Sequence, residues 1–375
     1  MPISRYRDAG IPSGGLTTSI VAVVTDVVRG GRPIVGYGFA SVGRFAQGGL
    51  IRERFAPRLL DAPDLMNREG TNLDPFRAWS VMMAGEKPGG HGERCVAVGT
   101  VDMAVWDAAA KIADLPLHRF LAERAGGPPL AADTVAVYAG GGYYYPADDV
   151  SRLSDELRWF LDHGYTRAKI KIGGAALEQD LRRVEAAAKL IPTAGLAVDA
   201  MNAYDARGSR EAATALAPHR LWWFEDICDP LDLETHAAVA ASYPHPIAAG
   251  EALFSTAEAR LLDRYGGLRR DRDILLFDPV HCYGIPGYLD IIRCLEERGW
   301  PRRAFWPHGG HLFSLHLAAA LGLGGAEVNP LSFGPFGGLP DGDAPVEGRT
   351  APPQVAGIGF ELKPDLSRLF ATLLV

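Results

Sequence analysis

Cysteine is scarce in this chain. Four cysteines occur among 375 residues, and no two of them have the CxxC spacing. This usage excludes a disulfide framework and a cysteine-based zinc site, and it is typical of a reducing cytoplasm. Long apolar runs are also absent, so we expect no membrane span and, in the polar residues 1–15, no signal peptide. The sequence therefore predicts a cytoplasmic protein with no membrane partner.

Positive charge is in short supply as well. Acidic residues outnumber lysine and arginine by 45 to 38, which gives a net charge of −7, and no basic run occurs. This balance argues against a nucleic-acid-binding surface. Hydrophobic residues make up 47% and charged residues 22% of the chain, which is ordinary for a globular protein. The length is sufficient for one (β/α)₈-type barrel with a smaller second domain.

A short apolar strand that carries two lysines is present at residues 168–172, before Gly173-Gly174. Side chains alternate along a strand, so Lys169 and Lys171 face one way and Ile170 faces the other. A buried parallel strand is normally apolar on both faces, so two lysines there would need a charged cavity or a bound anion. An exposed edge strand explains the same pattern equally well from this segment alone.

Five further apolar stretches follow this strand, and each ends in an ionisable residue. Successive ionisable residues are 26 to 30 residues apart, which is the length of one strand–helix unit. In a (β/α)₈ barrel the carboxyl ends of the strands form one mouth, where active sites are built. The pattern therefore predicts a barrel that brings these residues together. They are Asp199, Glu225, Glu251, Asp278 and His308, which end stretches 196–199, 221–225, 247–251, 274–278 and 304–308.

The chain is expected to form three parts. Residues 1–133 contain a predicted hairpin (19–28 and 34–39) and helical patterns at 50–60, 74–83 and 96–112, and they are assigned to an α+β domain. Residues 134–345 are assigned to the barrel. Residues 346–375, with a strand-like and then helical pattern from Ile358, are expected to return to the first domain.

Three consecutive strand ends carry carboxylates: Asp199, Glu225 and Glu251. Three convergent carboxylates do not all stay ionised without a cation, and oxygen-only ligands favour a hard ion such as Mg²⁺. The alternative is three unrelated loop acids, but three in step with the strand–helix period make that alternative weak. We predict a magnesium site.

The next two strand ends carry Asp278 and His308, which are expected to pair so that the acid fixes the histidine tautomer and raises its pKa. A helix-capping aspartate beside a loop histidine is the alternative, and His308 with His311 is a weaker candidate for a metal pair. Lys171 is the expected base, with a pKa lowered by the neighbouring cation of Lys169. Glu327 is assigned to the eighth strand, although a surface acid fits it almost as well.

A base, a metal triad and a His–Asp pair together suggest one reaction class. The metal would bind a substrate carboxylate, Lys171 would remove the α-proton, and the metal would stabilise the resulting enediolate.

With these motifs assembled, the sequence resembles the enolase superfamily, in its mandelate racemase/muconate lactonizing enzyme subgroup, and most closely the D-tartrate dehydratases. The resemblance rests on the residues above together with segments 86–94 (EKPGGHGER), 141–146 (GGYYYP) and 307–311 (PHGGH). It implies an α+β capping domain over a modified (β/α)₇β barrel, Mg²⁺, dehydration of an acid sugar, and a homo-oligomer. It also implies Lys171 as base, His308 as acid, Asp278 as its partner and Glu327 beside the enediolate, with Lys87, Tyr143 and Lys169 as substrate contacts.

The sequence departs from that family's pattern at several positions. The first ligand is followed by Ala200-Met201-Asn202, and the second by Asp226 where glutamate is usual, although no ligand is lost. Val42 stands where the tartrate dehydratases have a polar asparagine. The first strand of the cap, before Pro2, is not found, so we expect either a frayed cap edge or a native start further upstream.

Three functions fit this sequence. An acid-sugar dehydratase, acting on D-tartrate or a related hydroxy dicarboxylic or sugar acid, is the first. A racemase or epimerase of a 2-hydroxy acid is the second, since two-base proton transfer needs the same residues. A barrel that binds a small acid without turnover is the third, and the complete set of catalytic residues argues against it.

Overall fold

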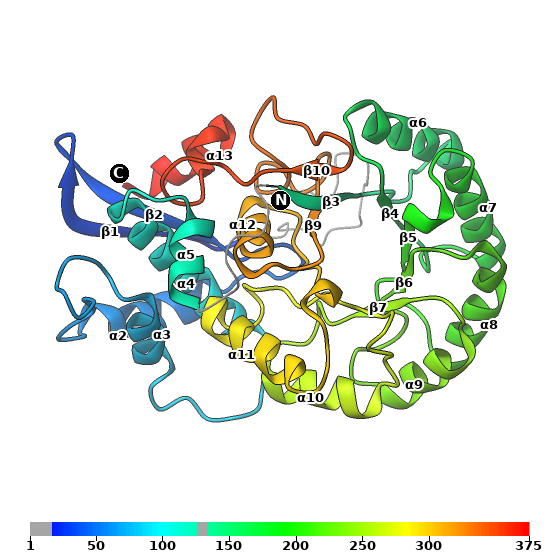
Figure 1. Ribbon diagram of the computed structural model, residues 1–375, viewed down its shortest axis with the longest axis horizontal. Coiled ribbons are helices and arrows are strands. Elements are labelled where there is room, and N and C mark those ends of the chain that lie inside the picture. The colour runs from blue at the N-terminus through cyan, green and yellow to red at the C-terminus, as the bar shows by residue number, and fades with distance from the viewer. Residues whose placement is uncertain (1–16, 126–133, 375) are drawn as a thin grey trace.

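The computed structural model describes residues 17–125 and 134–374, and two packed parts are visible in it (Figure 1). The expectations for residues 1–15 lie outside the described residues. The division at 133/134 and 345/346 stays a prediction, as do the cytoplasmic location and the homo-oligomer. No helix within the described ranges is both long enough and apolar enough to span a membrane.

The first part is a β-hairpin packed on a long helix. Strands β1 (Ile20–Arg29) and β2 (Arg32–Phe39) pair antiparallel, and helix α4 (Glu93–Ile112) lies against them. Gly36 and Gly38 permit this close approach because they have no Cβ. A Cβ at Gly36 would lie 2.0 Å from the Ala104 carbonyl oxygen, and a Cβ at Gly38 would lie 2.2 Å from the Thr100 carbonyl oxygen. The remaining helices of this part are α1 (Gly48–Leu50), α2 (Ala56–Leu60), α3 (Pro75–Met83) and α5 (Leu117–Ala125), with a π-helical turn at Ile51–Phe55 between α1 and α2.

The C-terminal segment packs on this hairpin, as expected. Helix α13 (Pro364–Ala371) places the Phe370 ring on Tyr37, with ring centroids 4.7 Å apart, and it lies beside β1 and β2 in Figure 1. The strand-like pattern expected after Ile358 is wrong: residues 360–362 form a 3₁₀ turn. Gly357 and Gly359 both have left-handed backbone (φ 81° and 83°), which is incompatible with an extended strand.

The second part is a curled, mostly parallel sheet wrapped by helices, which confirms the predicted α/β barrel fold. Its parallel strands follow the order β9-β3-β4-β5-β6-β7-β8, and β10 adds an antiparallel edge to β3. The strands are β3 (Val135–Gly140), β4 (Ala168–Lys171), β5 (Leu196–Asp199), β6 (Trp223–Glu225), β7 (Ile247–Ala249), β8 (Ile274–Leu275), β9 (Ala326–Val328) and β10 (Arg349–Thr350).

Helices alternate with these strands and form an arc around the outside of the sheet (Figure 1). They are α6 (Asp149–Asp162), α7 (Leu177–Ala188), α8 (Ala206–Leu216), α9 (Leu233–Ser242), α10 (Thr256–Tyr265), α11 (Gly284–Glu296) and α12 (Leu312–Leu321). Their apolar stripes face the sheet, as for Leu153, Leu157 and Phe160 of α6, which are fully buried. This alternation is the origin of the period of 26 to 30 residues seen in the sequence.

One expected strand does not form. Residues 302–304 make a 3₁₀ turn, and Phe305 forms only a single bridge to Leu275 of β8. Pro301 and Pro307 flank this segment, and neither can donate a backbone hydrogen bond to a ladder. The segment still closes the sheet, because the amide of Trp306 donates to Leu275 and its neighbour Phe305 accepts from Gly324.

An aromatic cluster fills the interior of the sheet below the mouth. Tyr138, Trp223 and Trp306 are buried there, and the Tyr138 and Trp223 rings lie edge to face at 5.1 Å. The Lys169 ammonium is 5.8 Å from the centre of the Tyr138 ring. The charged groups described below therefore pack directly against a close-packed aromatic layer, which restricts their movement.

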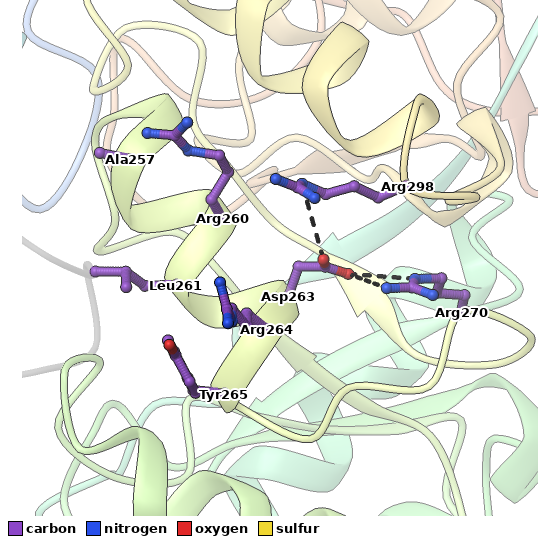
Figure 2. Close-up of a pocket in the computed structure, with 8 residues that line it drawn as sticks. All are labelled: Ala257, Arg260, Leu261, Asp263, Arg264, Tyr265, Arg270 and Arg298. Carbon is purple, nitrogen blue, oxygen red and sulfur yellow. Dashed lines mark hydrogen bonds and ion pairs between the residues drawn. The ribbon is translucent and has the colours of Figure 1, made fainter.

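A hollow of about 680 Å³ lies on the outer surface beside α10 (Figure 2). Asp263 is the most tightly held residue of this hollow, with a side chain that is 6% exposed. Its carboxylate accepts hydrogen bonds from Arg270 at 2.9 Å and from the Trp300 indole at 2.8 Å. Arg298 is more distant, with its Nε 3.9 Å from the carboxylate. None of its lining residues belongs to the site described next. They are Ala257, Arg260, Leu261, Asp263, Arg264, Tyr265, Arg270 and Arg298.

Candidate active site

Strand β4 delivers both lysines to the interior of the barrel. It lies between β3 and β5, so the edge-strand alternative is wrong. Lys169 is 1% and Lys171 8% exposed, and both ammonium groups contact carboxylates of the neighbouring strands. The register pairs Lys171 with Asp199 on β5, and Asp199 with Glu225 on β6. The charged surroundings that two buried lysines require are therefore present.

The three predicted metal ligands converge. Asp199, Glu225 and Glu251 each offer a carboxylate oxygen, and these oxygens all lie within 4.8 Å of one another. The pKa of Glu225 is raised to about 8, because burial and the charges of Asp199 and Glu251 outweigh the opposing cation of Lys169. Crowding of this kind is relieved by a cation. An oxygen-only donor set of three carboxylates fits Mg²⁺, so the residues present fit the predicted ion.

Lys169 is the centre of an ion-pair network at the base of this cluster. Its Nζ lies 3.2 Å from Glu327 Oε1 and 3.4 Å from Asp199 Oδ2, and it also contacts Glu225. Glu327 is on β9, as predicted, and its other oxygen accepts from the Gly309 amide at 3.1 Å. These contacts hold the carboxylates in fixed positions without occupying every oxygen.

The predicted acid pair forms. His308 Nδ1 lies 2.8 Å from Asp278 Oδ2, and its Nε2 lies 3.3 Å from Glu251 Oε2. Burial lowers the pKa of His308, but the carboxylates of Glu251 and Asp278 outweigh burial and raise it to about 9. Asp278 is fully buried, yet the neighbouring histidines hold its pKa well below the usual range. A protonated imidazole with Nε2 toward the carboxylates can act as an acid.

One electrostatic expectation is wrong. The pKa of Lys171 is raised, not lowered: burial opposes its charge, but the contacting carboxylate of Asp199 dominates. The Lys169 cation does lower it, but only weakly, because Lys169 is itself paired with Glu225 and Glu327. Adjacent lysines on one strand do not depress each other's pKa strongly when each has its own carboxylate.

The predicted substrate contacts are only partly brought together. Tyr143 is 5% exposed, and the Lys171 ammonium lies 5.2 Å from the centre of its ring. Tyr143 also packs with Val42 and Phe333 in a small apolar cluster. Lys87 is exposed, and its side chain pairs with no other described residue. Arg44 lies over the ring of Phe254, 4.7 Å from its centre.

Several residues at the site were not identified from the sequence. Ser41 and His281 contact or approach Asp278: Ser41 Oγ lies 2.6 Å and His281 Nε2 3.7 Å from its Oδ2. His311 does not join His308 in a metal pair; its Nε2 lies 3.0 Å from Ser41 Oγ. Trp223 donates to Glu225 Oε2 at 2.7 Å. The only signal for Ser41 in the sequence was a polar residue two positions after a predicted strand, which resembles the signal that identified the carboxylates.

Comparison with known proteins identifies the family of this chain and several relatives. Residues 152–366 match the family model described as enolase C-terminal domain-like. The chain is 29% identical to an arabinonate dehydratase of Saccharolobus solfataricus over 62% of its own length and 60% of that protein. It is 28% identical to an L-talarate/galactarate dehydratase of Salmonella typhimurium, over 81% of this chain and 71% of that one.

Solved structures agree with the sequence relatives. An L-talarate dehydratase from Polaromonas, crystallised with Mg and L-glucarate, has a TM-score of 0.70 at 27% identity, and the match covers 92% of this chain and 91% of that one. The matching region of the family model contains the strand ends that carry both lysines, the three carboxylates and the His–Asp pair. Because that region is more than half of the 375 residues, the chain belongs to the enolase superfamily, as a member of its mandelate racemase/muconate lactonizing enzyme branch.

Proposed function

We propose that this protein is a Mg²⁺-dependent hydro-lyase that dehydrates acid sugars. One observation carries the proposal. Lys171 contacts Asp199 at one end of the carboxylate row, and His308 contacts Glu251 at the other end. A substrate that binds along this row would have a base at one side and an acid at the other. The relatives named above as dehydratases act on arabinonate and on talarate or galactarate, which are compounds of the same class.

Each chemical step of the proposed dehydration can be assigned to a residue of the site. Mg²⁺ held by Asp199, Glu225 and Glu251 would supply positive charge that stabilises the substrate carboxylate as its α-proton leaves. Lys171 takes that proton, and the C–H electron pair is delocalised into the carboxylate. The β-carbon–oxygen bond then breaks, and the hydroxyl leaves as water with the proton from His308 Nε2. The enol that remains takes up a proton at the former β-carbon and releases its hydroxyl proton, which gives a 2-keto acid. Glu327 lies beside this path through its contact with Lys169.

The base must be neutral before it takes a proton. In the structure Lys171 is held as an ammonium by Asp199. Asp199 would share its charge with a bound divalent cation, and it would then stabilise the Lys171 ammonium less strongly. We infer that metal loading and base activation are linked at this residue pair.

For the substrate, we propose D-tartrate or a related small hydroxy dicarboxylic acid. Access to the carboxylates is narrow, because Asp199 and Glu225 are buried and only Glu251 and His308 are partly exposed. The apolar cluster of Val42, Tyr143 and Phe333 adjoins Lys171 through Tyr143, whose ring centre lies 5.2 Å from the Lys171 ammonium. Tyr143, Lys169 and Lys87 are the proposed contacts. Lys87 reaches the substrate only if its loop closes over the mouth.

A racemase or epimerase is the second candidate. The same separation of Lys171 and His308 would let each residue serve one enantiomer. The two reactions differ in outcome, since a racemase inverts the α-carbon without loss of water. The non-catalytic barrel is disfavoured, because no residue of the base–metal–acid set is missing.

A screen of acid sugars and diacids for 2-keto acid formation in the presence of Mg²⁺ tests the proposal. We expect the highest turnover with substrates that have a polar or anionic distal end, because Arg44, and Lys87 once its loop closes, would place cations there. Asp199→Asn should abolish turnover. Glu185→Gln also removes one negative charge, but at an exposed position on α7, so it should have no effect on turnover. Inversion without water loss, or equal turnover of substrates with an apolar distal end, would contradict the proposal.

A further inference from the structure

Ser41 is a buried residue of the cap that touches the acid side of the barrel site. It lies two residues after the end of β2, and its side chain is fully buried. Its hydroxyl oxygen lies 2.6 Å from Asp278 Oδ2 and 3.0 Å from His311 Nε2. The cap and the barrel are therefore joined at a polar contact, and that contact is made on the carboxylate that orients His308.

The protons in this network can be assigned. Asp278 is ionised, so its Oδ2 accepts from Ser41 O–H and from His308 Nδ1–H. With its own proton donated, the Ser41 oxygen accepts from His311 Nε2–H. The Asp278 Oδ1 atom accepts from the amide of Val280 at 2.7 Å. The carboxylate is thus held on both oxygens, and one of the two hydrogen bonds to side chains on Oδ2 comes from the cap.

The backbone at Ser41 is strained, which is unusual for a residue with no role. Its φ of 57° is in the left-handed region, where non-glycine residues cost about 1 kcal/mol or more. Buried neighbours hold it there: Phe39 and Ala40 precede it, and Val42 packs on Tyr143. The Ser41 amide also donates to the Phe39 carbonyl at 2.8 Å. Glycine would relieve this strain but would lose the hydroxyl.

We propose that Ser41 is a positioning residue for the acid step. Its hydroxyl fixes Asp278, and through Asp278 it fixes the His308 ring so that Nε2 is directed at the departing hydroxyl. This inference rests on the proposed dehydration. It also means that His308 is correctly oriented only when the cap is docked on the barrel. Ser41 does not touch the substrate, so its effect should be on kcat and not on KM.

Two substitutions separate the hydroxyl from the backbone. Ser41→Ala and Ser41→Gly both remove the hydroxyl, but only glycine also removes the strain. We expect both to lower kcat for dehydration about 10-fold, in the range seen when a charge-assisted hydrogen bond to an orienting group is lost. KM, and the Lys171-dependent exchange of the substrate α-proton with solvent deuterium, should stay within about 2-fold of the wild type.

An NMR measurement tests the role of Ser41 without requiring turnover. In protein labelled with ¹⁵N-histidine, the His308 Nδ1–H resonance reports its hydrogen bond to Asp278, and we expect it to move in Ser41→Gly. A wild-type kcat in both variants would overturn the proposal. A wild-type kcat in Ser41→Gly alone would also overturn it, because backbone strain would then explain the lower kcat of Ser41→Ala. If the wild type dehydrates no acid sugar, the proposed function fails separately. The His308 resonance then decides: a shift supports the role of Ser41, and an unchanged signal overturns it.

Discussion

Lys171 and His308 occupy different sides of the same carboxylate row, so single substitutions should separate two chemical steps. His308→Asn keeps roughly the size of the side chain but removes the acid. We expect exchange of the substrate α-proton with deuterium to continue, because Lys171 can return a deuteron to the same face. Keto acid formation should fall by about 10²- to 10⁴-fold, the usual contribution of a general acid. Proton NMR in D₂O and a keto acid assay measure the two rates.

Lys171→Ala is the matched variant. Both exchange and dehydration should stop, because Lys169, the other lysine on this strand, is held by Glu225 and Glu327 and cannot replace the base. If His308→Asn dehydrates at the normal rate, or Lys171→Ala still exchanges the α-proton, the assignment of base and acid is wrong.

At the level of single residues, the site could be predicted from the sequence where the strand–helix unit repeats at a regular spacing. Asp199, Glu225 and Glu251 were found because each ends a strand, and parallel strand ends meet at one mouth. Ser41 was missed because its partner, Asp278, is 237 residues away and no period links the cap to the barrel. The pKa of Lys171 was also mispredicted, since it depends on which carboxylate is in contact, and this is a property of the packed structure alone.

At the level of elements, the hairpin and α4 depend on two glycines. Gly36→Ala would place a methyl group 2.0 Å from the Ala104 carbonyl oxygen, so strand and helix must separate. We expect a loss of about 1–3 kcal/mol in the free energy of unfolding, as for overpacked cores. Urea unfolding measures this. Gly49→Ala is the control, because its new methyl group would meet nothing within 4 Å, and equal stability losses in both variants would refute the packing argument.

A buried histidine links α5, α12 and the C-terminal segment. His316 Nδ1 accepts from the His118 amide at 3.1 Å, and its Nε2 donates to the Ile358 carbonyl at 3.0 Å. This arrangement uses both nitrogens of the neutral ring. Burial and the neighbouring His118 together lower the pKa of His316 from 6.5 to about 3, although the hydrogen bond to the Ile358 carbonyl opposes this shift.

The consequence is a loss of stability in acid. Between pH 6.5 and about 3 the unfolded chain binds a proton at His316 that the folded chain does not, so stability falls as the pH falls. At pH 5 the loss should be about 2 kcal/mol. His316→Gln keeps a donor and an acceptor but cannot titrate, so it should lose less stability between pH 7.5 and pH 5. The exposed His163→Gln is the control, and an identical pH dependence in His316→Gln and wild type would disprove the argument.

At the scale of the whole molecule, the α/β barrel was predictable because its helices and strands alternate with a constant period. The exceptions are explained by local chemistry. Residues 302–306 lie between two prolines and make one bridge instead of a strand, and Gly357 and Gly359 turn the segment that was expected to be extended. The placement of Lys87 was not predictable, because an exposed loop is not constrained by core packing.

Metal dependence is a property of the whole molecule, since the ligands come from three strands and the lysines that contact them from a fourth. A ligand that binds only the folded state adds about 2.7 kcal/mol of stability at a free concentration 100 times its Kd. Mg²⁺ should therefore raise the Tm of the wild type and restore activity to chelator-treated protein. Asp199→Asn, Glu225→Gln and Glu251→Gln should each remain folded by circular dichroism but lose both responses, whereas Glu185→Gln should keep them. Full activity of the chelated protein, or a Tm increase with Mg²⁺ that persists in all three ligand variants, would show that these carboxylates do not hold the ion.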